Sequence, residues 1–123
     1  MLRRRPPEHG GRPGVRDENL LESALTRPQH KWHYDEKADL AILAAAYGFG
    51  LVTNHPYRDG NKRIGFLAMV TFLGINGHEF EAPDTEVVTT MLALASGRVS
   101  EPELADWIRP PQLQAKTLVP LAA

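Results

Sequence analysis

The chain has 123 residues, of which 42% are hydrophobic, and it contains no cysteine. This length predicts one domain with a modest core, and the absence of cysteine excludes a disulfide scaffold and a thiolate zinc site. The formal net charge of −1 provides no broad attraction to nucleic acid or membranes, so we expect neither as a direct partner.

Residues 1–14 are rich in arginine, proline and glycine, and this composition predicts a poorly ordered basic N-terminal stub. No apolar stretch follows the basic start, which argues against a secretory signal. No apolar run reaches the ~20 residues that span a membrane. We therefore expect a cytoplasmic protein.

A short helix is predicted over residues 18–26, with Asp17 as its N-cap and Pro28 as its end. We interpret residues 27–37 as a polar loop with aromatic side chains, whose conformation (helical, extended or mobile) the sequence leaves open.

Two strongly apolar helices are expected next, over residues 38–53 and 61–76. The first is apolar nearly all round, which is typical of a buried central helix. In the second, Gly65 and Gly74 are expected to allow close helix contact, and Gly77 is placed as the residue that ends it.

The C-terminal part predicts two more helices. One covers residues 85–96, ends at Gly97 and has a core face of Val88, Met91, Leu92 and Ala95. The other begins with a capping box, Ser100 to Glu103, and its inward-facing residues are expected to be Leu104, Trp107 and Ile108. Residues 110–123 are interpreted as a tail. The pattern predicts a small all-α bundle over residues 15–109, with a short extended piece in 27–37 or 78–82.

The most informative segment is the loop between the two apolar helices, residues 55–63, His-Pro-Tyr-Arg-Asp-Gly-Asn-Lys-Arg. Gly60 and Asn61 fall where the second helix begins. A helix N-terminus has free backbone N–H groups and a positive dipole end, so this position suits a phosphate group.

The residue types in the loop fit phosphoryl transfer. His55 can accept a hydroxyl proton, and Asp59 is an oxygen ligand suited to Mg²⁺. Gly60 and Asn61 offer backbone N–H groups to a phosphate, and the Asn61 side chain can help to hold metal or phosphate. Arg63 can fork onto phosphate oxygens, and Lys62 adds a point charge.

Each of these residues also has a structural interpretation. His55 could be a surface or helix-capping residue, and Asp59 and Asn61 could be turn and cap residues. Lys62 and Arg63 could form a solvated first turn, although cations there oppose the helix dipole, which favours a functional role.

The loop resembles the motif of the Fic/Doc superfamily, in the form found in Doc (death-on-curing) toxins. Further similarity lies in Gly14-Val15-Arg16-Asp17, in Leu20 to Leu25, in Asn76-Gly77 and in Ala93 to Gly97. The resemblance covers roughly residues 10–109. Doc-like proteins usually begin with a full helix, which this chain replaces by the basic stub, so we expect either a start upstream of Met1 or loss of that helix.

The resemblance also implies a reaction. Family members that transfer AMP carry a second glycine at the position of Lys62 and a further arginine at that of Phe66. Doc-like members carry the lysine, lack that arginine and transfer the γ-phosphate of ATP. The resemblance therefore implies a Mg²⁺- and ATP-dependent kinase that phosphorylates a threonine of elongation factor Tu and arrests translation. The alternatives are an AMP transferase and a catalytically decayed antitoxin-binding module.

The family also implies partners. A Phd-like antitoxin would fold its C-terminal segment as a helix in a groove of the toxin and block the nucleotide cleft. The self-inhibitory motif of some relatives, Ser/Thr-x-x-x-Glu-Gly/Asn, is missing, which fits inhibition by a second protein. The region 27–37 corresponds to a flap that docks the target, and we expect Trp32 and Tyr34 to serve there beside His55, with Trp32 as a core residue the competing interpretation.

Overall fold

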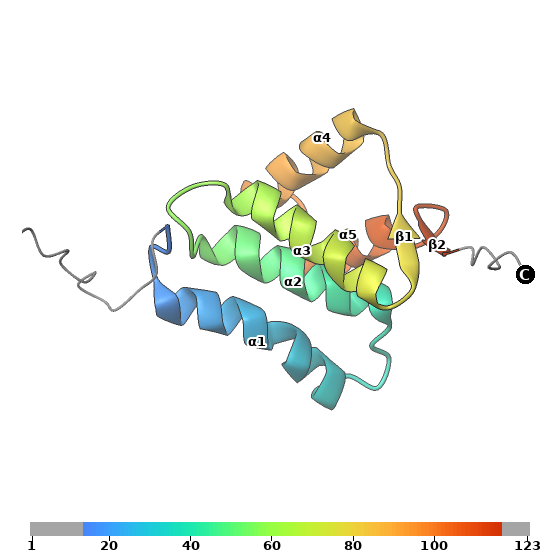
Figure 1. Ribbon diagram of the computed structural model, residues 1–123, viewed down its shortest axis with the longest axis horizontal. Coiled ribbons are helices and arrows are strands. Elements are labelled where there is room, and N and C mark those ends of the chain that lie inside the picture. Colours follow the sequence, from blue (N-terminus) through green and yellow to red (C-terminus); the bar gives the residue numbers. More distant parts are fainter. Residues whose placement is uncertain (1–13, 117–123) are drawn as a thin grey trace, which may run out of the picture.

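The computed structural model describes residues 14–116, which form a helical bundle with one small sheet (Figure 1). The elements in chain order are α1 (Glu18–Tyr34), α2 (Leu40–Asn54), α3 (Asn61–Ile75), β1 (His78–Phe80), α4 (Asp84–Ala95), α5 (Glu101–Ile108) and β2 (Leu113–Ala115). The predicted all-α class is confirmed. Within the described residues, no helix is long and apolar enough to cross a membrane.

Helix α2 lies at the centre of the bundle, between α1 and α3 and against α5 (Figure 1). Small residues let the neighbouring helices approach it closely. A Cβ at Gly50 would lie 3.1 Å from the Ala24 backbone of α1, and one at Gly65 of α3 would lie 2.7 Å from Val52. The predicted close contact is therefore confirmed at Gly65. It is wrong at Gly74, where a Cβ would meet only the Lys116 side chain, 3.5 Å away.

Helix α1 is longer than the sequence predicts. It continues through Pro28, which is buried inside it, to Tyr34, so the prediction that Pro28 ends the helix is wrong. Residues 27–34 are helical, and the predicted extended piece does not lie there. A proline inside a helix removes one backbone hydrogen bond and costs about 3 kcal/mol, so other contacts must hold this second half in place.

Those contacts come from both sides of Pro28. Arg27 forms an ion pair and two hydrogen bonds with Glu101, at the start of α5, and its guanidinium lies 4.8 Å from the ring centre of Phe49. Lys31, one turn further on, lies 3.7 Å from the other carboxylate oxygen of Glu101. The Glu101 side chain is only 10% exposed, so these charges are partly removed from water. Tertiary contacts thus override the local effect of the proline.

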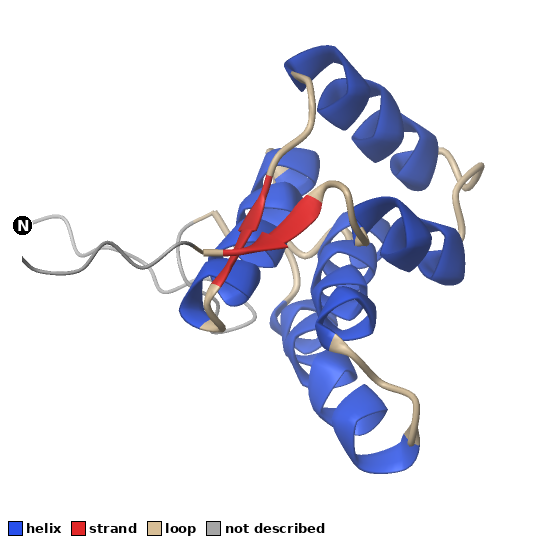
Figure 2. Cartoon of the chain, turned by 90° about the vertical axis from the view of Figure 1, so that its right-hand side faces the viewer, coloured by secondary structure: helices blue, strands red, loops and turns tan. Residues whose placement is uncertain are grey.

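The segment after α5 is also part of the fold. Strand β2 pairs antiparallel with β1, with Phe80 opposite Leu113 (Figure 2). The extended segment expected in residues 78–82 is confirmed, whereas the interpretation of residues 110–123 as a tail misses this strand. Phe80 packs 4.9 Å from the Trp107 ring and 5.9 Å from Phe66, so the strand pair closes the core between α3 and α5.

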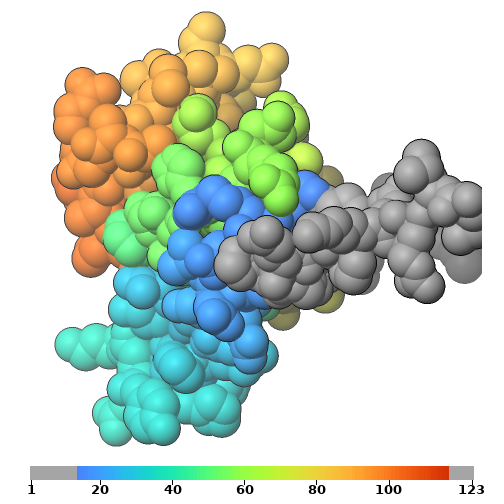
Figure 3. Space-filling model, turned by 90° about the vertical axis from the view of Figure 1, so that its left-hand side faces the viewer, coloured from blue at the N-terminus to red at the C-terminus, as the bar shows by residue number. Residues whose placement is uncertain are grey.

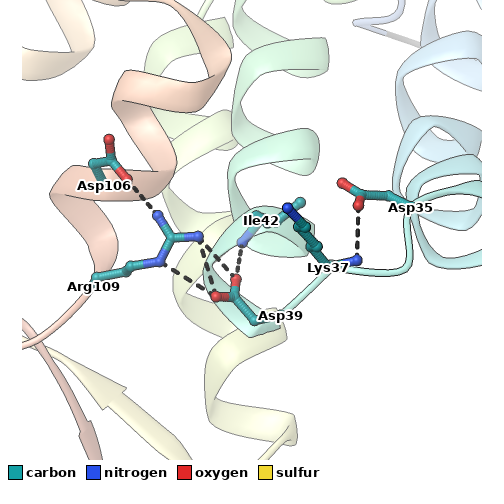
Figure 4. Close-up of polar contacts among 6 residues, drawn as sticks. All are labelled: Asp35, Lys37, Asp39, Ile42, Asp106 and Arg109. Atoms are coloured by element: carbon teal, nitrogen blue, oxygen red, sulfur yellow. Dashed lines mark hydrogen bonds and ion pairs between the residues drawn. The ribbon is translucent and has the colours of Figure 1, made fainter.

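Arg109 fastens the end of α5 to the start of α2 (Figure 4). Its guanidinium contacts Asp106 and donates to Asp39 over 3.1 Å, while Asp39 also caps α2 by accepting from the Ile42 N–H over 2.8 Å. The partners are half-exposed, so the ion pairs themselves contribute little to stability, and the cap contributes more.

Helix α4 differs from its predicted core face in two residues. Met91 and Leu94 are buried, whereas Val88 and Leu92 are 58% and 48% exposed. The prediction placed both exposed residues in the core because the apolar stripe of α4 is wider than the surface that packs on the bundle. The capping box between Ser100 and Glu103 is present as predicted, and Leu104 and Ile108 of α5 are buried.

Candidate active site at the start of helix α3

The loop between α2 and α3 lies at one end of the molecule, next to the segment that precedes α1. Figure 3 faces this end, where the blue residues that follow position 13 lie against the green residues of the loop. Val15 and Tyr57 form an isolated antiparallel bridge, and the Arg58 N–H donates to the Gly14 carbonyl over 2.9 Å. Tyr57 also packs against a small apolar cluster, so the loop is held on two sides.

His55 ends α2 in a left-handed backbone conformation, with φ 51° and ψ 52°. It is the one non-glycine residue with positive φ in the range 14–116. Such a conformation costs about 1–2 kcal/mol outside glycine and persists only where surrounding contacts impose it. The His55 side chain is exposed, and no described residue forms a hydrogen bond with its imidazole.

Asn61 is only 7% exposed, and both the oxygen and the nitrogen of its amide form a hydrogen bond inside the loop. The Tyr57 N–H donates to Asn61 Oδ1 over 2.9 Å, and Asn61 Nδ2 donates to the Tyr57 carbonyl over 3.0 Å. The side chain therefore shapes the loop, as its turn-residue interpretation proposes, and its part in holding metal or phosphate stays a prediction. Its backbone N–H lies in the first turn of α3.

The N-terminus of α3 is open. Its N-cap is Gly60, with φ 73°, and no described side chain caps the first turn. Lys62 and Arg63 are exposed, and no carboxylate of residues 14–116 lies within ion-pair distance of either. The Arg63 guanidinium folds back over Gly60, where an added Cβ would lie 2.8 Å from Nη2. Backbone donors and two cations thus meet at one helix end, which favours anion binding.

A cavity of about 470 Å³ extends from this helix end to α4. One wall is formed by the polar first turn of α3, and the other by apolar residues of α4. The lining residues are Gly60, Lys62, Arg63, Phe66, Val87, Val88, Met91 and Leu92. The apolar residues of α4 that do not enter the core therefore form one side of this cavity.

Asp59 lies on the exposed surface of the loop, directly before Gly60. The described residues contain no group of three or more histidine or acidic side chains that could bind a metal by themselves. A single carboxylate still suits Mg²⁺, which is commonly held by one or two carboxylates together with substrate phosphates and water. Asp59 lies beside the open helix end, and its role as a Mg²⁺ ligand stays a prediction.

Trp32 and Tyr34 lie far from this loop. The 17 residues of α1 extend over about 25 Å at 1.5 Å per residue, with Asp17 at the motif end and these two residues in the last turns. Trp32 and Tyr34 are 65% and 84% exposed, so neither is a core residue. The structure does not bring the two aromatic side chains to His55, and their role in docking a target stays a prediction.

One residue near the loop received no role from the sequence. Arg16 donates from Nε to the His55 carbonyl over 2.8 Å and from Nη2 to the Asn54 carbonyl over 3.1 Å. Arg16 belongs to the Gly14-to-Asp17 segment that resembles the family, and this was the one sign in the sequence that it matters. The sequence does not show which backbone carbonyls its side chain reaches.

The chain is similar to known proteins over its N-terminal part. Residues 2–73 match the family model described as Fic/DOC family. Over 74 residues, the chain is 43% identical to Toxin Doc of Mycolicibacterium smegmatis. The matched segment covers 59% of this chain and spans 57% of the length of that relative. The family match includes α2, the loop between α2 and α3, and α3 as far as residue 73.

Proposed function

The chain belongs to the Fic/DOC family, and from this premise we propose that it is the toxin of a toxin–antitoxin pair and acts as a protein kinase in the cytoplasm. It transfers the γ-phosphate of ATP to a threonine or serine hydroxyl of a translation factor, elongation factor Tu, and thereby arrests translation. The similarity to Toxin Doc supports the toxin role. The observation that carries the chemistry is the uncapped start of α3, where two cations have no carboxylate partner among residues 14–116, at the end of the loop that begins with the exposed His55.

The cavity has a polar wall for the phosphates of a nucleotide and an apolar wall for its base and ribose. The backbone N–H groups of the first turn, together with Lys62 and Arg63, neutralise phosphate oxygens, and charge-assisted hydrogen bonds are about twice as strong as neutral ones. The exposed apolar residues of α4 provide a surface for the base and ribose. A volume of about 470 Å³ lies within the range of ligand pockets.

His55 acts as the general base in this proposal. Its imidazole takes the proton of the target hydroxyl, the hydroxyl oxygen forms a bond to the γ-phosphorus, and the bond from that phosphorus to the β–γ bridging oxygen breaks. The products are the phosphorylated protein and ADP. Asp59 would hold Mg²⁺, which lowers the charge on the phosphate oxygens when it is bound.

The direction of transfer depends on two positions. Lys62 adds a charged side chain to the lining of the cavity, at the position where AMP-transferring relatives have glycine. Phe66 lines the same cavity, packs 5.9 Å from Phe80 and carries no charge, where those relatives have arginine. A phosphate chain therefore meets its cations at the first turn of α3 and none at Phe66, which supports γ-phosphate transfer over AMP transfer.

A Phd-like antitoxin is the second proposed partner. An apolar groove of about 400 Å³ runs between α1, α2 and α3, and several of its residues are exposed. Its lining includes Leu25, Tyr47, Ile64, Leu67, Phe72 and Ile75. An amphipathic antitoxin helix could place its apolar face in such a groove.

Label transfer to purified elongation factor Tu tests the reaction. The protein is incubated with Mg²⁺ and ATP labelled on either the γ- or the α-phosphate, in parallel with His55→Ala and with His33→Ala, which changes an exposed histidine on α1. We expect label from the γ position only, lost in His55→Ala and kept in His33→Ala. Label from the α position would show an AMP transferase instead. No label from a folded sample that still binds the antitoxin would point to a different target or to a decayed binding module.

A further inference from the structure

Arg16 contacts three consecutive carbonyls at the end of α2. Its Nε and Nη2 donate to His55 and Asn54 over 2.8 and 3.1 Å, and its backbone N–H donates to the Pro56 carbonyl over 2.7 Å. The last carbonyls of a helix have no partner inside the helix, so a residue from elsewhere supplies the donors here. We propose that Arg16 is a positioning residue that holds His55 in its left-handed conformation and thereby presents the imidazole for catalysis.

The charge of Arg16 suits this position. No basic residue lies in the last turn of α2, and no carboxylate among the described residues pairs with Arg16. A cation at a helix C-terminus interacts favourably with the dipole, and a charged donor makes a stronger hydrogen bond than a neutral one. Arg16 therefore compensates the open end of α2 from outside the helix.

The geometry also explains why an arginine stands here. The two side-chain bonds leave different nitrogens of one planar group and reach adjacent carbonyls, Asn54 and His55, so they fix the direction of both. A lysine ammonium has no such fixed fork. Because the His55 carbonyl is held, rotation of His55 out of its strained conformation would break the Nε bond.

The alternative is that Arg16 only fastens the segment before α1 to the bundle. Asn54 provides the matched control, since its Nδ2 donates to the Leu20 carbonyl over 3.0 Å and ties the same end of α2 to α1 without contacting His55. A purely structural role predicts that loss of either side chain lowers stability and leaves the catalytic constant of the folded protein unchanged.

The test compares Arg16→Ala, Arg16→Lys and Asn54→Ala in the full chain. The inference about kcat depends on the proposed kinase activity, so the backbone of His55 is followed separately by the NMR chemical shifts of its Cα and Cβ, which report φ and ψ. In Arg16→Ala we expect the shifts to leave their left-handed values and kcat to fall about ten- to a hundredfold, as a misplaced catalytic group does, while the KM for ATP changes less than twofold. In Arg16→Lys, kcat and the His55 shifts should lie between those of the wild type and those of Arg16→Ala. Asn54→Ala should lower only the melting temperature.

The proposal would be overturned if Arg16→Ala kept the His55 shifts and the kcat of the wild type. It would also be overturned if Asn54→Ala lost as much kcat as Arg16→Ala. If Arg16→Ala does not fold, Arg16→Lys decides by the same two readouts. If the wild type transfers no phosphate, the proposed function fails, whereas the shifts of His55 still decide whether Arg16 holds its backbone.

Discussion

The starts of α3 and α5 are built in opposite ways. At α5, the Ser100 side chain accepts from the Glu103 N–H, the Glu103 carboxylate accepts from the Ser100 N–H, and the first turn contains two acidic residues. At α3, the N-cap is a glycine, no described side chain caps the turn, and the charged residues of the first turn are Lys62 and Arg63.

The difference shows where the protein gives up local stability. Helix α5 starts with a capping box and an acidic first turn, whereas at α3 no described side chain caps the start and the charges of the first turn are reversed. His55, the first residue of the loop that leads to α3, has a strained backbone conformation in addition. Helix α3 forms nonetheless, because its apolar face packs on α2. The backbone N–H groups of its first turn have no side-chain cap among the described residues, so they can bind an anion. The following experiments alter one helix start or the other.

The largest effect is expected from His55→Ala, which removes the proposed base beside the open helix end. Expression of the variant in cells should no longer be toxic, because loss of a general base slows transfer by about 10²- to 10⁴-fold. Binding of the antitoxin should be unchanged, as measured by calorimetry. A toxic His55→Ala variant would refute the assignment of the base.

Lys62→Glu gives α3 an acidic first turn like that of α5. Mg-ATP should bind more than tenfold more weakly, because a charge-assisted hydrogen bond contributes about 1.5–3 kcal/mol and the new carboxylate repels phosphate. The free energy of unfolding without ligand should rise by about 0.3–1 kcal/mol, since the new charge suits the dipole. Calorimetry and urea unfolding measure the two changes. Unaltered affinity would show that the phosphates do not contact this turn.

Ser100→Ala removes the cap of α5. The free energy of unfolding should fall by about 1 kcal/mol, in the usual range for an N-cap serine, with no change in affinity for Mg-ATP. Urea unfolding at neutral pH measures the first quantity. A parallel loss of ATP affinity would mean that the two helix starts are not independent.

The smallest effect concerns the charge of Glu103. Hydrogen bonds from the backbone and then the side chain of Ser100 lower the pKa of Glu103 below its ordinary value. A carboxylate whose pKa is lower in the folded than in the unfolded protein stabilises the fold above the unfolded pKa, and the effect is lost as pH falls through the folded pKa. The melting temperature of Glu103→Gln should therefore lie slightly below that of the wild type at neutral pH and approach it in acid. A gap that widens in acid would contradict the sign of the shift.

Local patterns were sufficient to predict α2, α3 and the capping box of α5. In each, the apolar periodicity or the cap lies within a few neighbouring residues. The continuation of α1 through Pro28 was not predictable in this way, because it depends on ion pairs from Arg27 and Lys31 to Glu101, which lies far along the chain. Strand β2 likewise exists only through its pairing with β1.

The candidate site was located from the sequence, but its internal contacts were not. The order of residue types predicted an open helix start after Gly60, and the structure has one. The Asn61 amide is used by the Tyr57 backbone, and Arg16 reaches the His55 carbonyl, because the chain brings these carbonyls into reach only when it is folded. The exposed residues Val88 and Leu92 were assigned to the core because the apolar stripe of α4 is wider than the surface that packs on the bundle.

An NMR titration of the backbone amides with Mg-ATP tests the central claim, that the start of α3 is an anion site and the start of α5 is not. The account predicts progressive shifts for the amides of residues 61–63, reproduced in part by inorganic phosphate, and no shifts for residues 101–103. Equal shifts at both helix starts, or shifts at neither in a folded sample, would contradict it.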